Sequence, residues 1–308
     1  MRLLLFTSLT AALLIYGGMV GLMRGHDRLF PLMPIAFVDA YYTALGIEPL
    51  VTRDPIQTSD IIRIAHAAGE FEGSVYRNDM PALEANRKHF RLFEIDFILT
   101  LDGKIVCLHD WGPSFQRLWA EDEERLDLPL NFKEFKDITR EAGCWPSRVA
   151  TFLKNNPSRS IVTDFKGHKS QHHNVLSLLG NQIQPFKNES YTDQIIPQIY
   201  HPSELSSIKN IGFEKVIWTL YRSNYTDQQI LRHLRYLDIW AVTMPVNRVT
   251  HKFLQELNSA GVYAFTHPVD DCGNASELVK AGVNGVYTKN IGYLVHDAKG
   301  NIRCEYKK

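Results

Sequence analysis

The feature that most constrains the fold is a regular alternation of short apolar runs with segments of helical periodicity, from residue 61 to residue 288. Short apolar runs rich in β-branched and aromatic residues are typical of buried strands. We expect strands at 61–66, 92–99, 160–165, 194–200, 215–220, 238–243, 262–266 and 285–288. We expect helices at 81–90, 147–155, 171–179, 203–210, 226–235, 249–260 and 275–281. Strands that alternate with helices in this way predict an α/β fold, the (β/α)8 TIM barrel, for which about 250 residues is typical.

Residues at the ends of the expected helices support this assignment. N-cap residues and terminal glycines fall at helix boundaries, namely Asp79, Ser203 and Thr226 at starts and Gly212, Gly261 and Gly282 at ends. A doubly wound open sheet is the alternative, but no glycine-rich phosphate loop follows the first strand. The strand-like run 104–108 is extra, and we interpret it as a continuation of the second strand after the Asp102-Gly103 turn.

The N-terminal segment is apolar. Residues 3–23 contain no charged residue, with Arg2 before them and Arg24 and Arg28 after them. This length can cross a bilayer as a helix of roughly 20 residues. A cleaved signal peptide would have a shorter apolar region and a small-residue cleavage site, and a buried soluble helix is a third alternative. We expect a transmembrane anchor in residues 1–24, a juxtamembrane connector in 25–58 that is helical around 35–45, and a barrel domain in 59–308. Positive charge on both sides leaves the orientation open.

Charge and cysteine usage exclude several classes of protein. The formal net charge is zero, which argues against a nucleic-acid partner. The four cysteines, Cys107, Cys144, Cys272 and Cys304, show no C-x-x-C spacing, which excludes a zinc ribbon or a thioredoxin-like motif. Cys107 lies in an apolar run, so we interpret it as a free buried thiol.

Two carboxylates stand two residues apart in the second expected strand, Glu94 and Asp96, between apolar residues. Residues at i and i+2 of a strand point to the same face, so these carboxylates project together. Like charges side by side repel unless a cation or a shared proton lies between them. The pair therefore indicates part of a metal site.

Other polar residues lie at the ends of the first three strands. His66 ends the first strand, His109 follows the extension of the second, and Asp164 and Lys166 end the third. Catalytic side chains of a barrel come from the C-terminal ends of its strands, so these residues are expected to converge with Glu94 and Asp96.

The expected cluster has the composition of a phosphodiester-cleaving site. Three carboxylates suit one divalent cation, Mg²⁺ or Ca²⁺. Lys166 suits a phosphate, and His66 and His109 can serve as general base and general acid. Most other histidines are interpreted as ordinary surface or core residues: His89, His168, His172, His173, His201, His233, His251 and His296.

These residues resemble the motifs of the glycerophosphodiester phosphodiesterase family, within the phospholipase C-like barrels. That family shows H-R-G, P-E-N-T, E-x-D, T-x-D-G, H-D and E-x-K in order. The similar stretches here are Ala65-His66-Ala67-Ala68-Gly69, Arg77-Asn78-Asp79, Glu94-Ile95-Asp96, Thr100-Leu101-Asp102-Gly103, His109-Asp110, Asp164-Phe165-Lys166 and the closing Gly282–Thr288 segment.

The resemblance implies roles for the matching residues. His66 and His109 would be the acid–base pair, Glu94, Asp96 and Asp164 would hold the metal, and Lys166 would contact phosphate.

The chain also departs from the family pattern. Ala67 replaces the arginine that follows the first histidine, Arg77 replaces a glutamate, and Asp164 and Lys289 replace Glu and Asp. We take Arg77 as a substitute phosphate-binding cation.

Three functions follow from the sequence. The first is a metal-dependent hydrolase of glycerophosphodiesters or phospholipid headgroups, anchored in a membrane with an extracytoplasmic catalytic domain. The second is a phospholipase D-like activity of the sphingomyelinase D type on lysophospholipid or sphingolipid, which Asp164 favours. The third is an inactive barrel that binds an anionic ligand. The leaving group, a cyclising alternative to hydrolysis and the oligomeric state stay open.

Overall fold

The computed structural model describes residues 31, 33–50, 53–56, 61–120, 128–167, 172–183, 191–221, 223–297 and 302–305. The expected transmembrane anchor in residues 1–24 lies outside these ranges. Within them, every helix is too short or too polar to pass through a lipid bilayer.

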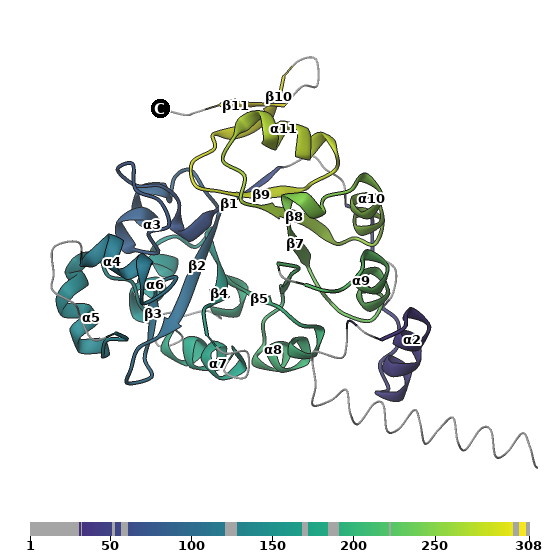
Figure 1. Cartoon of the computed structure of the whole chain (residues 1–308), viewed down its shortest axis with the longest axis horizontal. Helices are drawn as coiled ribbons and strands as arrows, with labels where there is room; N and C mark the ends of the chain where they lie inside the picture. Colours follow the sequence, from purple (N-terminus) through teal and green to yellow (C-terminus); the bar gives the residue numbers. More distant parts are fainter. Residues whose placement is uncertain are drawn as a thin grey trace, which may run out of the picture.

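Eight parallel strands form a closed ring, which confirms the predicted TIM barrel (Figure 1). They are β1 (Ile62–Ala65), β2 (Leu92–Leu99), β4 (Ser160–Phe165), β5 (Ile195–Ile199), β6 (Ile217–Thr219), β7 (Ala241–Pro245), β8 (Tyr263–His267) and β9 (Gly285–Thr288). β1 pairs with β9 on one side and with β2 on the other, so the sheet closes. This closure excludes the doubly wound alternative.

The expected helices surround the ring, so that the wall between strands and helices is the main apolar core. They are α3 (Met80–Asn86), α6 (Pro146–Asn155), α7 (His172–Ile183), α8 (Leu205–Ile211), α9 (Asp227–Leu234), α10 (His251–Ser259) and α11 (Cys272–Lys280), with short 3₁₀ turns at His66–Ala68, Arg140–Ala142, Tyr191–Asp193, Pro202–Glu204 and Val246–Arg248. Asp79 and Thr226 cap α3 and α9 as predicted. Ser203 does not cap α8, because it lies inside the 3₁₀ turn that precedes that helix.

An excursion between β2 and β4 departs from the prediction. β3 (Ile105–Cys107) runs antiparallel to β2, with Cys107 opposite Phe97, so it reverses the chain instead of continuing the strand. α4 (Pro113–Trp119) and α5 (Phe132–Thr139) follow it and were not predicted. Their apolar side chains close over a separate small core: Val106, Leu108, Phe115, Leu130 and Phe135.

The helix expected around 35–45 is confirmed as α2 (Ile35–Ala44). It packs on the outside of α9, on the opposite side of the barrel from α4 and α5 (Figure 1). The Tyr42 ring stacks on Tyr236 at 4.6 Å between centroids, and the Tyr42 hydroxyl lies 2.7 Å from His233 Nδ1. Part of the expected connector therefore lies against the barrel wall.

All four cysteines are paired, as Cys107–Cys144 and Cys272–Cys304. The prediction of a free thiol at Cys107 was wrong. The backbone N–H of Cys107 donates to the carbonyl of Cys144 at 3.0 Å, so β3 and the segment before α6 run side by side and bring the two sulfurs together. The second disulfide ties α11 to the C-terminal hairpin of β10 (Tyr293–His296) and β11 (Ile302–Glu305).

Candidate active site

Neighbouring strands bring three buried carboxylates together. Asp96 on β2 and Asp164 on β4 are register partners in the parallel sheet, and Glu94 lies two residues earlier on the same face of β2. One oxygen atom from each carboxylate lies within 4.8 Å of the others. Glu94 and Asp96 are each 2% exposed and Asp164 is 8% exposed. The expected convergence of these three residues is what the structure shows.

Burial and mutual repulsion act on this cluster. Burial, together with the charges of Asp96 and Asp164, raises the pKa of Glu94 well above its ordinary value. Burial also works to raise the pKa of Asp96, but the Lys166 ammonium and nearby histidines outweigh it and lower that pKa. The surrounding groups therefore do not fully neutralise the negative charge of the cluster. Of the two β2 carboxylates, Glu94 is the less stable in its ionised form.

Lys166 supplies the positive charge inside the cluster. Its Nζ donates to Asp164 Oδ2 at 2.6 Å and lies 2.9 Å from Asp96 Oδ1. Burial works against the ammonium, but Asp96, Asp164 and Glu94 outweigh it and raise the pKa of Lys166. The Tyr200 hydroxyl donates to the other oxygen of Asp164 at 2.7 Å. One ammonium therefore faces three carboxylates, which leaves the group net negative.

Two further contacts fix the orientation of the carboxylates. Asn78 Nδ2 donates to Asp96 Oδ2 at 2.7 Å, while the backbone N–H of Asp96 donates to Asn78 Oδ1 at 2.9 Å. The backbone N–H of Ala67 donates to Glu94 Oε2 at 2.8 Å. Ala67 has a φ of 50°, a left-handed conformation that costs a non-glycine residue about 1 kcal/mol. This strained conformation, in the turn after β1, directs the backbone N–H of Ala67 toward Glu94.

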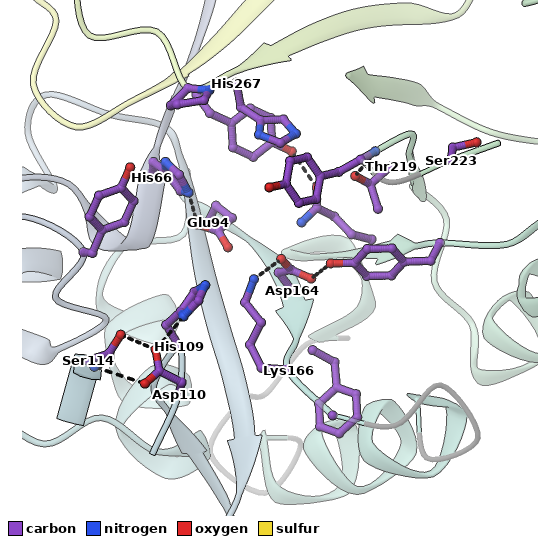
Figure 2. Close-up of a pocket in the computed structure, with 18 of the residues that line it drawn as sticks. His66, Glu94, His109, Asp110, Ser114, Asp164, Lys166, Thr219, Ser223 and His267 are labelled. Carbon is purple, nitrogen blue, oxygen red and sulfur yellow. Dashed lines mark hydrogen bonds and ion pairs between the residues drawn. The ribbon is translucent and has the colours of Figure 1, made fainter. Parts of the chain in front are cut away.

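The two predicted histidines lie on either side of Glu94 (Figure 2). His66 Nε2 is 3.9 Å from Glu94 Oε2, and burial lowers the pKa of His66. His109 lies in the loop after β3, and its Nδ1 is 2.9 Å from Asp110 Oδ2. That contact leaves Nε2 of His109 to face the pocket.

Asp110 is itself held in place. Burial works to raise the pKa of Asp110, but hydrogen bonds from Ser114 and His109 lower it to about 2. A carboxylate that stays ionised is a stable acceptor for His109, so it fixes the direction of that imidazole.

A cavity of about 860 Å³ is lined by most of these groups, namely His66, Glu94, His109, Asp110, Asp164 and Lys166. Its further lining includes residues that the sequence analysis did not select: Tyr76, Arg117, Gln198, Tyr200, Glu204, Thr219, Tyr221, His267 and Tyr287. Tyr200 follows β5 and His267 ends β8. Both residues stand at the C-terminal ends of expected strands, where the active residues of a barrel lie, so the sequence carried a signal for each of them.

The two arginines near the pocket have different surroundings. Arg77 does not line the cavity, because its Nε and a terminal nitrogen contact Asp79 Oδ2 at 2.7 and 2.6 Å. The geometry gives no support to the predicted phosphate contact of Arg77. Arg117, on α4, lines the cavity and contacts only the neutral oxygens of Ser74 and Tyr76, with no carboxylate partner among the described residues. Arg117 is thus the better placed cation for a substrate anion.

The donor set fits a hard divalent cation. Glu94, Asp96 and Asp164 offer carboxylate oxygens, the ligands that Mg²⁺ and Ca²⁺ prefer. Burial and repulsion from Asp96 and Asp164 raise the pKa of Glu94, and a cation among the three carboxylates would relieve that repulsion.

The sequence of this chain is similar to those of known phosphodiesterases. A sequence model described as the glycerophosphoryl diester phosphodiesterase family matches residues 71–293. YhdW of Bacillus subtilis, provisionally named a glycerophosphodiester phosphodiesterase, is 25% identical in an alignment of 269 positions that covers 77% of this chain and 97% of YhdW.

Solved structures share the fold. The glycerophosphodiester phosphodiesterase of Thermotoga maritima superposes with a TM-score of 0.58 at 17% identity, covering 76% of this chain and 96% of that one. An Oleispira antarctica phosphodiesterase, solved with its product sn-glycerol-3-phosphate, gives a TM-score of 0.57 at 15% identity and covers 74% and 92%. At these identities the likeness concerns the barrel alone.

Proposed function

We propose, from the premise that the chain belongs to the glycerophosphoryl diester phosphodiesterase family, that its pocket hydrolyses glycerophosphodiesters to glycerol phosphate and a free alcohol. The observation that carries the proposal is the convergence of Glu94, Asp96 and Asp164 between His66 and His109. A binding protein needs no such acid–base pair beside a cation site. The product complex of the Oleispira phosphodiesterase supports the substrate class.

The three carboxylates would hold one Mg²⁺ or Ca²⁺. When bound, the cation supplies positive charge to the phosphate oxygens as the transition state gains negative charge there. Asn78 and the N–H of Ala67 keep Asp96 and Glu94 pointed at that position. Lys166 lies beside it and offers its ammonium to a phosphate oxygen.

The histidines divide the proton transfers. His66, whose pKa is lowered by burial, is neutral at neutral pH and accepts the proton of the attacking oxygen. His109, in its imidazolium form with the Nδ1–H donated to Asp110, gives the Nε2 proton to the leaving oxygen. Both transfers require the phosphodiester to lie between the two histidines, beside Glu94.

Arg117 adds a second anionic contact at the pocket. The cavity holds the carboxylates of Glu94, Asp110, Asp164 and Glu204, so an anionic substrate needs cations that are not already paired. Lys166 is shared with two carboxylates, whereas within the described part of the chain Arg117 contacts only neutral oxygens. We assign the phosphate or an anionic headgroup to Arg117 in place of Arg77.

The disulfides support an extracytoplasmic location. Cysteine pairs form and persist in oxidising compartments, and all four cysteines of this chain are paired. Together with the uncharged run 3–23, they favour a barrel held outside the cytoplasm by an N-terminal anchor.

The test uses the purified full-length chain with a panel of glycerophosphodiesters and a lysophospholipid. We expect release of glycerol phosphate, loss of activity with EDTA and recovery with Mg²⁺ or Ca²⁺, and we expect Glu94→Gln to abolish it. The cation that restores activity identifies the metal. Release of the headgroup alcohol from lysophospholipid instead would favour the phospholipase D-like alternative. Turnover that withstands both EDTA and Glu94→Gln would contradict the mechanism.

A further inference from the structure

The outward face of α2 is apolar although it packs on nothing in the described part of the chain. α2 buries Val38, Tyr41 and Tyr42 against the barrel. A surface helix normally carries charged residues on the face opposite its buried stripe. Here exposed apolar residues extend along the helix and the segment after it, and we call them the α2 face: Ile35, Ala36, Phe37, Ala44, Ile47 and Leu50. Ile35, Phe37, Ile47 and Leu50 are each 36–44% exposed.

The polar groups around the α2 face are already satisfied. Thr43 lies on this face, but its hydroxyl donates to the carbonyl of Asp39 at 2.9 Å. The Asp39 carboxylate accepts from the Tyr236 hydroxyl at 2.8 Å and pairs with Arg232. The only other charged residue in 33–50 is Glu48, beyond the end of the helix. The exposed surface of the α2 face is therefore mainly apolar.

The exposed apolar residues are concentrated in this one segment. Of the seven large apolar residues that are exposed in the described ranges, four lie between residues 35 and 50. The other three, Leu101, Tyr221 and Val246, come from separate loops. Contiguous exposed apolar surface marks a contact with another molecule or a membrane.

The position of the chain just before α2 favours a membrane. Gln229 Nε2 donates to the carbonyls of Pro31 at 2.8 Å and Met33 at 2.9 Å, which fixes the start of α2 to α9. Only residues 24–30 separate this fixed point from the uncharged run 3–23. A fully extended chain from Met23 to Pro31 reaches about 29 Å. If the run lies in a bilayer, α2 is held within that distance of the membrane.

We propose that the α2 face is a membrane-contact surface that seats the barrel on the lipid bilayer. Apolar side chains of an interfacial helix insert at the boundary between headgroups and acyl chains. The barrel then has a fixed orientation in which the side formed by α2 and α9 faces the membrane.

The test labels single cysteines in the full-length chain. Because all four native cysteines are paired, Phe37→Cys introduces the one free thiol, to which the environment-sensitive fluorophore NBD is attached. Leu101→Cys is the matched control, since Leu101 is 66% exposed in the turn between β2 and β3 on the opposite side of the barrel. Ile47→Cys probes the α2 face independently should Phe37→Cys fail to fold. The proteins are reconstituted in phosphatidylcholine vesicles with and without doxyl-labelled lipid.

We expect doxyl lipid to quench the label at position 37 at least twofold more than the label at position 101. Equal quenching at the two positions on vesicle-bound protein would overturn the proposal. A label at 37 that is shielded from aqueous iodide but not quenched by doxyl lipid would show that a second copy or another segment covers the face, which also overturns it. Flotation with the vesicles is measured separately, and a chain that does not float removes the premise. None of these readings depends on enzymatic activity.

Discussion

Lys166 and Asp164 form a 2.6 Å ion pair between residues only two positions apart, at the C-terminal end of β4. The same ammonium lies 2.9 Å from Asp96 on the neighbouring strand. Without a bound cation, Lys166 therefore holds together carboxylates that would otherwise repel each other in a buried site. A divalent cation among the same carboxylates would compensate their charge in place of Lys166, and the ammonium could then contact the substrate.

Lys166→Met should destabilise the metal-free protein and abolish turnover. Removing one partner of a buried ion pair leaves uncompensated charge and costs about 3–5 kcal/mol. Added Mg²⁺ or Ca²⁺ should restore most of the lost stability but none of the activity, because the cation replaces the charge and not the phosphate contact. Thermal unfolding in EDTA and in each cation measures the first effect, and product release measures the second.

Lys154→Met is the control for that experiment, since Lys154 is an exposed residue of α6. It should change neither stability nor turnover. If added cation stabilises the wild type and Lys166→Met equally, Lys166 does not compensate the carboxylate charge when the metal is absent.

The acid–base assignment predicts large effects at two histidines. His66→Ala and His109→Ala should each lower kcat by about 10²–10⁴-fold, the usual contribution of a positioned proton donor or acceptor. Thermal unfolding should remain near that of the wild type for His109→Ala, whose side chain is 49% exposed. Steady-state rates on a glycerophosphodiester provide the measurement. His89→Ala, an exposed histidine outside the cavity, is the control and should keep full activity.

The sequence predicted the barrel and the cluster because both follow from local rules. Alternating periodicity predicts the β/α order, and two-residue spacing predicts that Glu94 and Asp96 share a face. The register that sets Asp96 beside Asp164 follows once the strands are parallel neighbours. These relations depend on residues close in sequence or on adjacent strands.

Contacts that depend on long-range packing could not be read from the sequence. The Cys107–Cys144 bond needs β3 to reverse and run beside the segment before α6, and no spacing rule specifies that. Arg77 carries a charge suited to phosphate, but in the folded chain its guanidinium pairs with Asp79. Asn78, next to it, is recognisable in the sequence only as part of a motif, and its bond to Asp96 appears only in the folded chain.

The two arginines should therefore behave differently. Arg117→Ala should raise KM roughly tenfold with little change in stability, because it loses one charged hydrogen bond to substrate worth about 1.5 kcal/mol. Arg77→Ala should leave KM unchanged and lower stability by about 3 kcal/mol, because Asp79 is 1% exposed and would lose its charged partner, keeping only the N–H of Ala82. Steady-state kinetics and urea unfolding separate the two effects. A raised KM for Arg77→Ala alone would return the phosphate contact to Arg77.

The disulfide of β3 should support catalysis as well as stability. Replacing Cys107 and Cys144 together by Ala should cost about 2–4 kcal/mol of stability. It should also lower kcat, because His109 follows Cys107 by two residues and depends on the position of β3. The matched control is Cys272→Ala with Cys304→Ala, which frees the C-terminal hairpin and should lower stability without lowering kcat. Equal losses of kcat in both pairs would contradict a local role for the first disulfide.

The link between α2 and the barrel predicts a pH effect on stability. His233 is fully buried beside Tyr42, and burial lowers the pKa of His233 to about 3. The unfolded chain, with an ordinary histidine pKa near 6.5, binds the proton at higher pH than the folded chain does. Stability from this neutral histidine is therefore complete above about pH 6.5 and falls as the pH drops toward 3, by about 1.4 kcal/mol per pH unit.

His233→Gln removes this titration while leaving an amide that can bond the Tyr42 hydroxyl. In EDTA, urea unfolding from pH 7 to pH 4 should show a slope shallower than that of the wild type by about 1.4 kcal/mol per pH unit below pH 6. His251→Gln, an exposed residue of α10, should keep the wild-type slope. Identical slopes for His233→Gln and the wild type would mean that His233 is protonated in the folded chain, and α2 would then not be held by a neutral histidine.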